Sequence, residues 1–166
     1  MPWTNMGTYR QYASALQINS NQALIIGGFN EKLEYLKSTE VISSSGSEKG
    51  NDFPVRISEH CSFIINSTHA MVTGGIDRRG IFSGTWFVDL ATTTFTPGPP
   101  MNEARNGHGC SIFRHGTKSF GLVVGGFPVY GSTEMLIDLD QESPTWTEGM
   151  QDQFKIVYLL LKSSFP

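Results

Sequence analysis

Hydrophobic residues along this chain gather in short runs, and each run ends at residues that favour turns. No segment keeps the 3.6-residue period of an amphipathic helix over a useful length. The clearest part of the pattern predicts four strands in succession, at 108–113, 119–126, 133–139 and 144–147. Turn-forming residues lie at 114–117 and 140–143. The pattern therefore predicts an all-β chain of short antiparallel strands.

Three of the apolar runs end on a pair of glycines, which indicates an internal repeat. The pairs are Gly27-Gly28, Gly74-Gly75 and Gly125-Gly126, and their second glycines are 47 and 51 residues apart. Other residues keep a similar spacing around each pair, namely an upstream arginine (Arg10, Arg56, Arg105) and a downstream threonine (Thr39, Thr85, Thr133). Four-stranded units of this length cannot bury both faces alone, so they are expected to stack.

These residues resemble the kelch repeat, whose motif couples a glycine pair with an upstream Arg and His and a downstream Trp. The resemblance covers about residues 3–150, and a period near 50 fits it. The third copy matches best, with Met101, Arg105, His108, Gly125, Gly126 and Trp146 in order. In the second copy, Phe95 stands at the position of the Trp. In the first copy, Ala13 stands at the position of the His, and residues 43–52 are expected to be an insertion.

The resemblance implies a kelch-type β-propeller with repeats at 8–54, 55–100 and 101–150. Three four-stranded antiparallel blades are expected, with a partial strand at Trp3 and a partial fourth-blade strand or non-repeat tail at 151–166. Propellers typically close with four to eight blades, so a propeller fragment is expected, with closure by oligomerisation as the alternative. The glycine pairs, together with Trp146, are expected to be structural, with an aromatic side chain packed on the bare backbone.

Composition narrows the possible partners. Charged residues make up 16% of the 166 positions, hydrophobic residues 39%, and the net charge is −3. Neither a disordered chain nor a basic nucleic-acid-binding surface fits these values. No run has the ~18 apolar residues of a membrane helix, so no membrane partner is expected.

The two cysteines, Cys61 and Cys110, each open an apolar run and are expected to be buried free thiols. One glycosylation sequon, Asn66-Ser67-Thr68, matters only in a secreted chain. Residues 1–5 are polar and do not resemble a signal peptide. A cytoplasmic location is expected, and a secreted parent protein stays open.

The loops between strands carry the candidate binding residues. In a blade, the loops after the second and fourth strands open on the same side, because alternate turns of an antiparallel sheet share an edge. Arginine and tyrosine are favoured interface anchors. We therefore expect a protein partner at this face, bound through Arg10, Arg56, Arg78, Arg79, Arg105, Phe127 and Tyr130. The resemblance to kelch repeats likewise implies a protein-interaction module that acts as a scaffold or adaptor.

Catalytic chemistry has little support in the sequence. His60 and His108 stand at equivalent repeat positions without neighbouring ligands, which favours a structural role over metal binding. The alternative function is a fragment of a propeller enzyme of the galactose-oxidase-like class. Such enzymes need a Tyr–Cys cross-link and a copper site, and the five tyrosines and two cysteines suggest no such set. No cofactor, metal or catalytic residue is expected.

Overall fold

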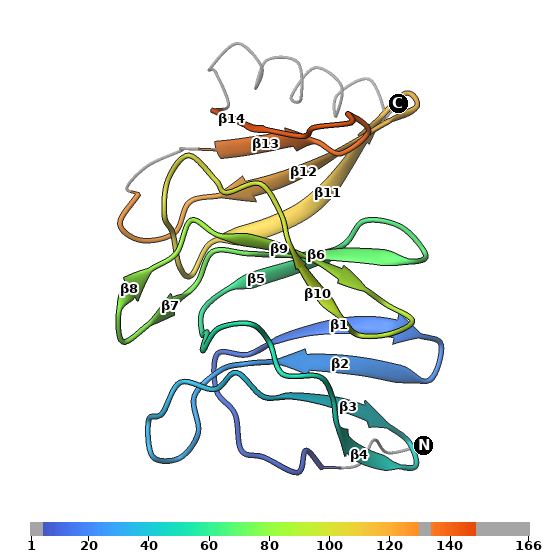
Figure 1. Cartoon of the computed structure of the whole chain (residues 1–166), viewed down its shortest axis with the longest axis vertical. Coiled ribbons are helices and arrows are strands. Elements are labelled where there is room, and N and C mark those ends of the chain that lie inside the picture. Colours follow the sequence, from blue (N-terminus) through green and yellow to red (C-terminus); the bar gives the residue numbers. More distant parts are fainter. Residues whose placement is uncertain (1–4, 130–133, 149–166) are drawn as a thin grey trace, which may run out of the picture.

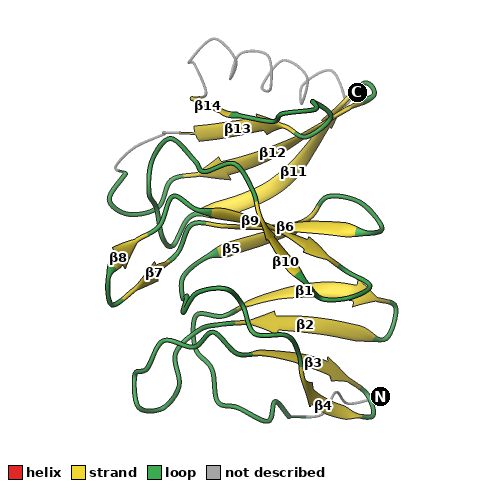
Figure 2. Ribbon diagram, in the orientation of Figure 1, coloured by secondary structure: helices red, strands yellow, loops and turns green. Residues whose placement is uncertain are grey.

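The computed structural model describes residues 5–129 and 134–148, which form three four-stranded sheets and one two-stranded hairpin (Figures 1 and 2). The described residues contain no helix, so the predicted all-β antiparallel character is confirmed. It follows that no helix in these ranges could cross a membrane.

Each sheet is an antiparallel meander of strands consecutive in the chain, apart from a hairpin inserted in the second. Sheet I consists of β1 (Ser14–Asn19), β2 (Gln22–Ile26), β3 (Thr39–Ser43) and β4 (Gly46–Lys49). Sheet II consists of β5 (Cys61–Ile64), β6 (His69–Thr73), β9 (Thr85–Asp89) and β10 (Phe95–Pro97), with the hairpin β7 (Ile76–Asp77) and β8 (Gly80–Ile81) between β6 and β9. Sheet III consists of β11 (Gly109–His115), β12 (Lys118–Val124), β13 (Glu134–Asp138) and β14 (Trp146–Glu148).

The three sheets stack along the long axis of the molecule (Figure 1). The first strands of the sheets are neighbours, because β5 contacts both β1 and β11. Sheet II is buried on both faces: Val72 belongs to the core shared with sheet I, and the preceding Met71 belongs to the core shared with sheet III. Successive side chains of a strand point to opposite faces, so one apolar run serves both cores.

The first glycine of the pairs in sheets I and II lets the segment that leads to the next sheet approach closely. Gly27 and Gly74 have φ of +60° and +57°, a conformation that glycine adopts without steric cost. A Cβ on Gly27 would lie 2.4 Å from the carbonyl oxygen of Ile57, and one on Gly74 would lie 2.4 Å from that of Arg105. This close approach also allows a hydrogen bond between the sheets, because the backbone N–H of Gly28 donates to Ile57 O at 2.8 Å. Packing between sheets therefore requires glycine at positions 27 and 74.

The second glycine serves its own sheet. Gly28, Gly75 and Gly126 also have positive φ, and a Cβ there would lie 2.5–2.9 Å from the carbonyl oxygens of Gln11, Ser58 and Asn106. The side chain closest to the pairs was expected to be a downstream aromatic residue. Instead, it is Ile57 at Gly27 and Gly75, with His60 the next side chain at both, and it is His108 at Gly74 and Gly126. Trp146 is buried elsewhere and donates its indole N–H to Pro99 O.

The two histidines at equivalent repeat positions each form a hydrogen bond with a hydroxyl group of the preceding sheet. His60 Nε2 and Ser14 Oγ are hydrogen bonded at 2.7 Å, as are His108 Nε2 and Thr73 Oγ1 at 2.8 Å. Burial lowers the pKa of His60 to about 3 and that of His108 to about 4. Both imidazoles are therefore neutral in the folded protein near neutral pH, in keeping with a structural role.

The sequence predicted that the two cysteines are free thiols, and this prediction is wrong. Cys61 on β5 and Cys110 on β11 form a disulfide with Cα atoms 5.9 Å apart, so sheets II and III are covalently joined. The error came from treating the two residues as separate core positions. They are 49 residues apart, about one repeat, and stacking of the first strands brings them together.

The expected insertion at 43–52 is also wrong. Residues 46–49 of that segment form β4, which pairs with β3 in register Glu40↔Lys49 to Ser43↔Gly46. The segment lacks the apolar residues that mark a buried strand, because β4 is an edge strand of sheet I. The partial strand at Trp3 and the tail at 151–166 lie outside the described residues.

Candidate functional site: a cationic pocket at one edge of the sheets

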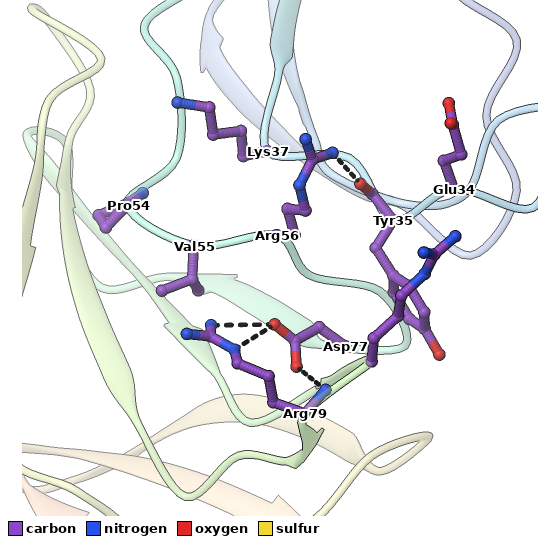
Figure 3. Close-up of a pocket in the computed structure, with 9 residues that line it drawn as sticks. Glu34, Tyr35, Lys37, Pro54, Val55, Arg56, Asp77 and Arg79 are labelled. Carbon is purple, nitrogen blue, oxygen red and sulfur yellow. Dashed lines mark hydrogen bonds and ion pairs between the residues drawn. The ribbon is translucent and has the colours of Figure 1, made fainter.

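A pocket opens where three segments from sheets I and II meet. They are the β2–β3 loop, the β4–β5 link and the β7–β8 hairpin, which lie along the same edge of the stacked sheets (Figure 1). The pocket has a volume of about 540 Å³, and Figure 3 shows its lining side chains. The lining residues are Glu34, Tyr35, Lys37, Pro54, Val55, Arg56, Asp77, Arg78 and Arg79.

Positive charge dominates this lining. Four of the side chains are cations and two are carboxylates, an excess of two positive charges in a chain whose net charge is −3. Two of the cations are paired: Arg79 with Asp77 at 2.9 Å, and Lys37 with Asp52 at 3.2 Å. Within the described residues, neither Arg56 nor Arg78 forms an ion pair, so both guanidinium groups can meet an anion from outside.

The β7–β8 hairpin is held in shape by its own charges. Asp77 is 7% exposed, and its carboxylate accepts hydrogen bonds from the backbone N and the Nε of Arg79. The Arg79 guanidinium also lies over the Phe82 ring, 5.9 Å from its centroid. Because the hairpin is only two residues per strand, these contacts fix the direction of its tip.

Arg56 is positioned by one hydrogen bond and projects from the β4–β5 link into the pocket (Figure 3). Its Nη1 donates to Tyr35 O at 2.7 Å, while the side chain stays exposed. Across the pocket lie the ion-paired Asp77 and Arg79 (Figure 3). The geometry leaves a planar, multi-donor cation at the mouth of a cavity, which suits recognition of a carboxylate.

The two other repeat arginines do not reach this surface. Arg10 is buried in sheet I, where Nη2 contacts Glu40 at 2.9 Å and Nη1 donates to Gly27 O and Ser38 O. Arg105 is 0% exposed and donates from Nη1 to Gly125 O. Both therefore hold the carbonyl of a first glycine rather than forming part of the binding face.

The remaining carboxylate of the pocket is ionised under ordinary conditions. Glu34 is exposed, and a hydrogen bond from Asn30 Nδ2 lowers its pKa, with smaller contributions from the positive charges of Lys32, Arg78 and Arg56. Glu34 therefore offsets part of the positive charge of the pocket.

An aromatic cluster adjoins the pocket. Phe29 contacts Tyr12 edge-on at 5.9 Å between ring centroids and Tyr35 at 4.5 Å. Tyr12 is 63% exposed and Leu33, in the same β2–β3 loop, is 71% exposed. Sequence reasoning missed these residues, although Tyr12 and Phe29 stand beside repeat markers. Phe127 is 52% exposed on the β12–β13 loop, and Tyr130 lies outside the described residues.

Within residues 5–129 and 134–148, no three His, Cys, Asp or Glu side chains lie close enough together to hold a metal ion. Comparison of the chain with models of known protein families and with curated proteins gave no match.

Proposed function

We propose that this chain is part of a kelch-type β-propeller that binds a protein partner at the edge carrying the cationic pocket. The partner would present an acidic segment whose carboxylates enter the pocket. The observation that carries this proposal is the pair Arg56 and Arg78, two exposed guanidinium groups lining one cavity with no carboxylate paired to either within the described residues.

The propeller part of the proposal is supported by the packing between sheets. The two interfaces between the three sheets repeat the same contacts. In each, the second glycine after the second strand donates to the link that follows, Gly28 N to Ile57 O and Gly75 N to Arg105 O, and the first strands of the two sheets lie side by side. Repetition of one interface is how propeller blades pack around an axis. Further sheets would be needed to close the ring.

The binding part is supported by the composition of the surface. Arginine and aromatic residues are enriched at the energetic centres of protein interfaces, and both kinds occur at this edge in exposed positions. The pocket combines Arg56 and Arg78 with the neighbouring Tyr12–Phe29–Tyr35 cluster. A peptide carrying Asp or Glu beside an apolar side chain would match both features.

The experiment is selection of a displayed random-peptide library on the purified chain. We expect enrichment of peptides containing Asp or Glu, with affinity that falls as salt is raised because exposed charges are screened. Arg56→Ala and Arg78→Ala should each weaken the binding of a selected peptide by about tenfold or more, since a hydrogen bond to a charged group contributes about 1.5–3 kcal/mol.

The matched control is a variant that loses one positive charge, as each arginine variant does, but at a site far from the pocket. Lys118 is an exposed cation at the opposite edge, at the start of β12, so Lys118→Ala should leave peptide affinity unchanged. Selection of peptides without acidic enrichment, or equal affinity in wild type and both arginine variants, would overturn the proposal.

The oxidase alternative is less well supported than it was from the sequence. A copper-radical enzyme requires a thiol for the Tyr–Cys cross-link. The chain has two cysteines, and both are used in the Cys61–Cys110 disulfide. This supports binding over catalysis for this chain.

A further inference from the structure

The turn between β5 and β6 carries the sequence Asn66-Ser67-Thr68 at the surface. It is the one Asn-X-Ser/Thr sequence of the 166 residues, and all three residues are exposed. The turn is well defined on the main chain, since Ile65 N and Asn66 N both donate to His69 O. Such a sequence can accept an N-linked glycan when it is accessible and the chain enters the secretory pathway.

The local geometry brings the two chemically important side chains together. Asn66 Oδ1 accepts hydrogen bonds from Thr68 Oγ1 at 2.8 Å, Thr68 N at 2.9 Å and His69 N at 2.9 Å. The Asn side chain thus closes an Asx turn on its own backbone. The acceptor atom of the amide is fully engaged, while Nδ2 donates to no other described residue and can carry a substituent without loss of a contact.

The disulfide provides an independent argument about compartment. Disulfides form and persist in oxidising environments and are rare in the cytosol, where thiols are kept reduced. Cys61 lies on the same strand that leads into the Asn66 turn, and its bond to Cys110 joins two sheets. The disulfide therefore favours folding in an oxidising compartment, and the secretory pathway, where N-glycosylation takes place, is one such compartment.

We infer that Asn66 is an N-glycosylation site and that this protein folds in the secretory pathway. The donor is a lipid-linked oligosaccharide pyrophosphate. A bond forms between Asn66 Nδ2 and C1 of the first sugar, the bond from C1 to the pyrophosphate oxygen breaks, one Nδ2 proton is lost, and the lipid pyrophosphate leaves. No oxidation or reduction is involved.

The position of the site suits a glycoprotein that binds a partner. The β5–β6 turn lies at the edge of sheet II opposite the β7–β8 hairpin (Figure 1). A glycan on Asn66 would cover the turn side of the stacked sheets and leave the Arg56 pocket open. This inference does not depend on the proposed peptide binding.

The test is translation of the full chain behind a signal sequence in the presence of microsomes, scoring only chains protected from added protease. We expect one glycan per chain, removed by peptide-N-glycanase, with conversion of Asn66 to Asp seen by mass spectrometry. Asn66→Gln and Thr68→Ala should lose the glycan completely.

Two conservative variants separate modification from folding. Ser67→Ala and Thr68→Ser both keep an acceptor sequence and should retain the glycan, with Thr68→Ser at equal or lower occupancy. The inference is overturned if the protected wild-type chain carries no glycan, or if Asn66→Gln keeps it.

Discussion

Ile57 occupies in sheet II the position that Arg10 occupies in sheet I. Equivalent backbone bridges, Gln11↔Phe29 and Ser58↔Ile76, directly follow these two residues. The acid that pairs with Arg10 is replaced as well, because Glu40 pairs with Ile25 on β2 and Trp86 pairs with the equivalent Val72 on β6. An ion pair in one sheet is therefore matched by two apolar residues in the next.

This replacement explains why Arg56 is available at the surface. Ile57 is 0% exposed and belongs to the core between sheets I and II, so its predecessor in the chain points the other way. Well-packed apolar residues can replace a buried ion pair with little change in stability. Sheet II thus keeps its packing while the neighbouring arginine lines the pocket.

Removing the acid from the buried ion pair should be strongly destabilising. Arg10 has 1% of its side chain exposed, and Glu40→Ala would leave its charge buried without a carboxylate. We expect a loss of about 3–5 kcal/mol in the free energy of unfolding, measured with urea. Glu48→Ala, on the exposed edge strand β4, is the control and should change stability by less than about 0.5 kcal/mol. Similar losses in both variants would contradict the assigned role of Glu40.

The three first glycines should respond differently to the same substitution. All have similar positive φ, so alanine costs about 1–2 kcal/mol of backbone strain at each. Gly74→Ala adds a clash with Arg105 O and His108, whereas a Cβ on Gly125 meets no described atom within 4 Å. We expect Gly74→Ala to unfold at clearly lower temperature than Gly125→Ala in a thermal melt. Equal effects would show that conformation alone, without packing between sheets, requires the glycine.

Acid should destabilise the protein through its buried histidines. Their folded-state pKa values, about 3 for His60 and about 4 for His108, are below the value near 6.5 of an unfolded imidazole. Between these values the unfolded chain binds more protons, so the contribution is complete above pH 6.5 and is lost as pH falls toward 3–4. Each imidazole contributes a slope of up to about 1.4 kcal/mol per pH unit.

The pH effect can be assigned by substitution. In urea unfolding measured across this pH range, His108→Gln should give a flatter dependence than wild type. His115→Gln, at the exposed end of β11, should keep the wild-type slope. A wild-type slope in His108→Gln would exclude this imidazole as the source.

Reduction should loosen the attachment of sheet III. The Cys61–Cys110 bond closes a long loop, and its loss should cost about 2–4 kcal/mol. We expect a reductant to lower the melting temperature of wild type and to leave Cys61→Ser/Cys110→Ser unchanged. Thiol labelling of the untreated native chain should find no free thiol. Labelling at both cysteines would contradict the pairing.

The sequence by itself determined the repeated features that depend on local physics. Apolar runs and turn residues predicted the strands of sheet III to within a few residues, because side-chain alternation and turn chemistry act over short distances. The glycine pairs marked the end of each second strand for the same reason, since a positive φ is a local demand.

Only the tertiary structure decided how these features meet. Spacings of 46 and 49 residues between Arg10, Arg56 and Arg105 could not reveal a shift of one position, yet that shift decides whether a side chain is buried or exposed. The disulfide and the pocket join segments that become neighbours through stacking of the sheets. Contacts of this kind depend on link lengths and on packing across the whole chain, which no local pattern records.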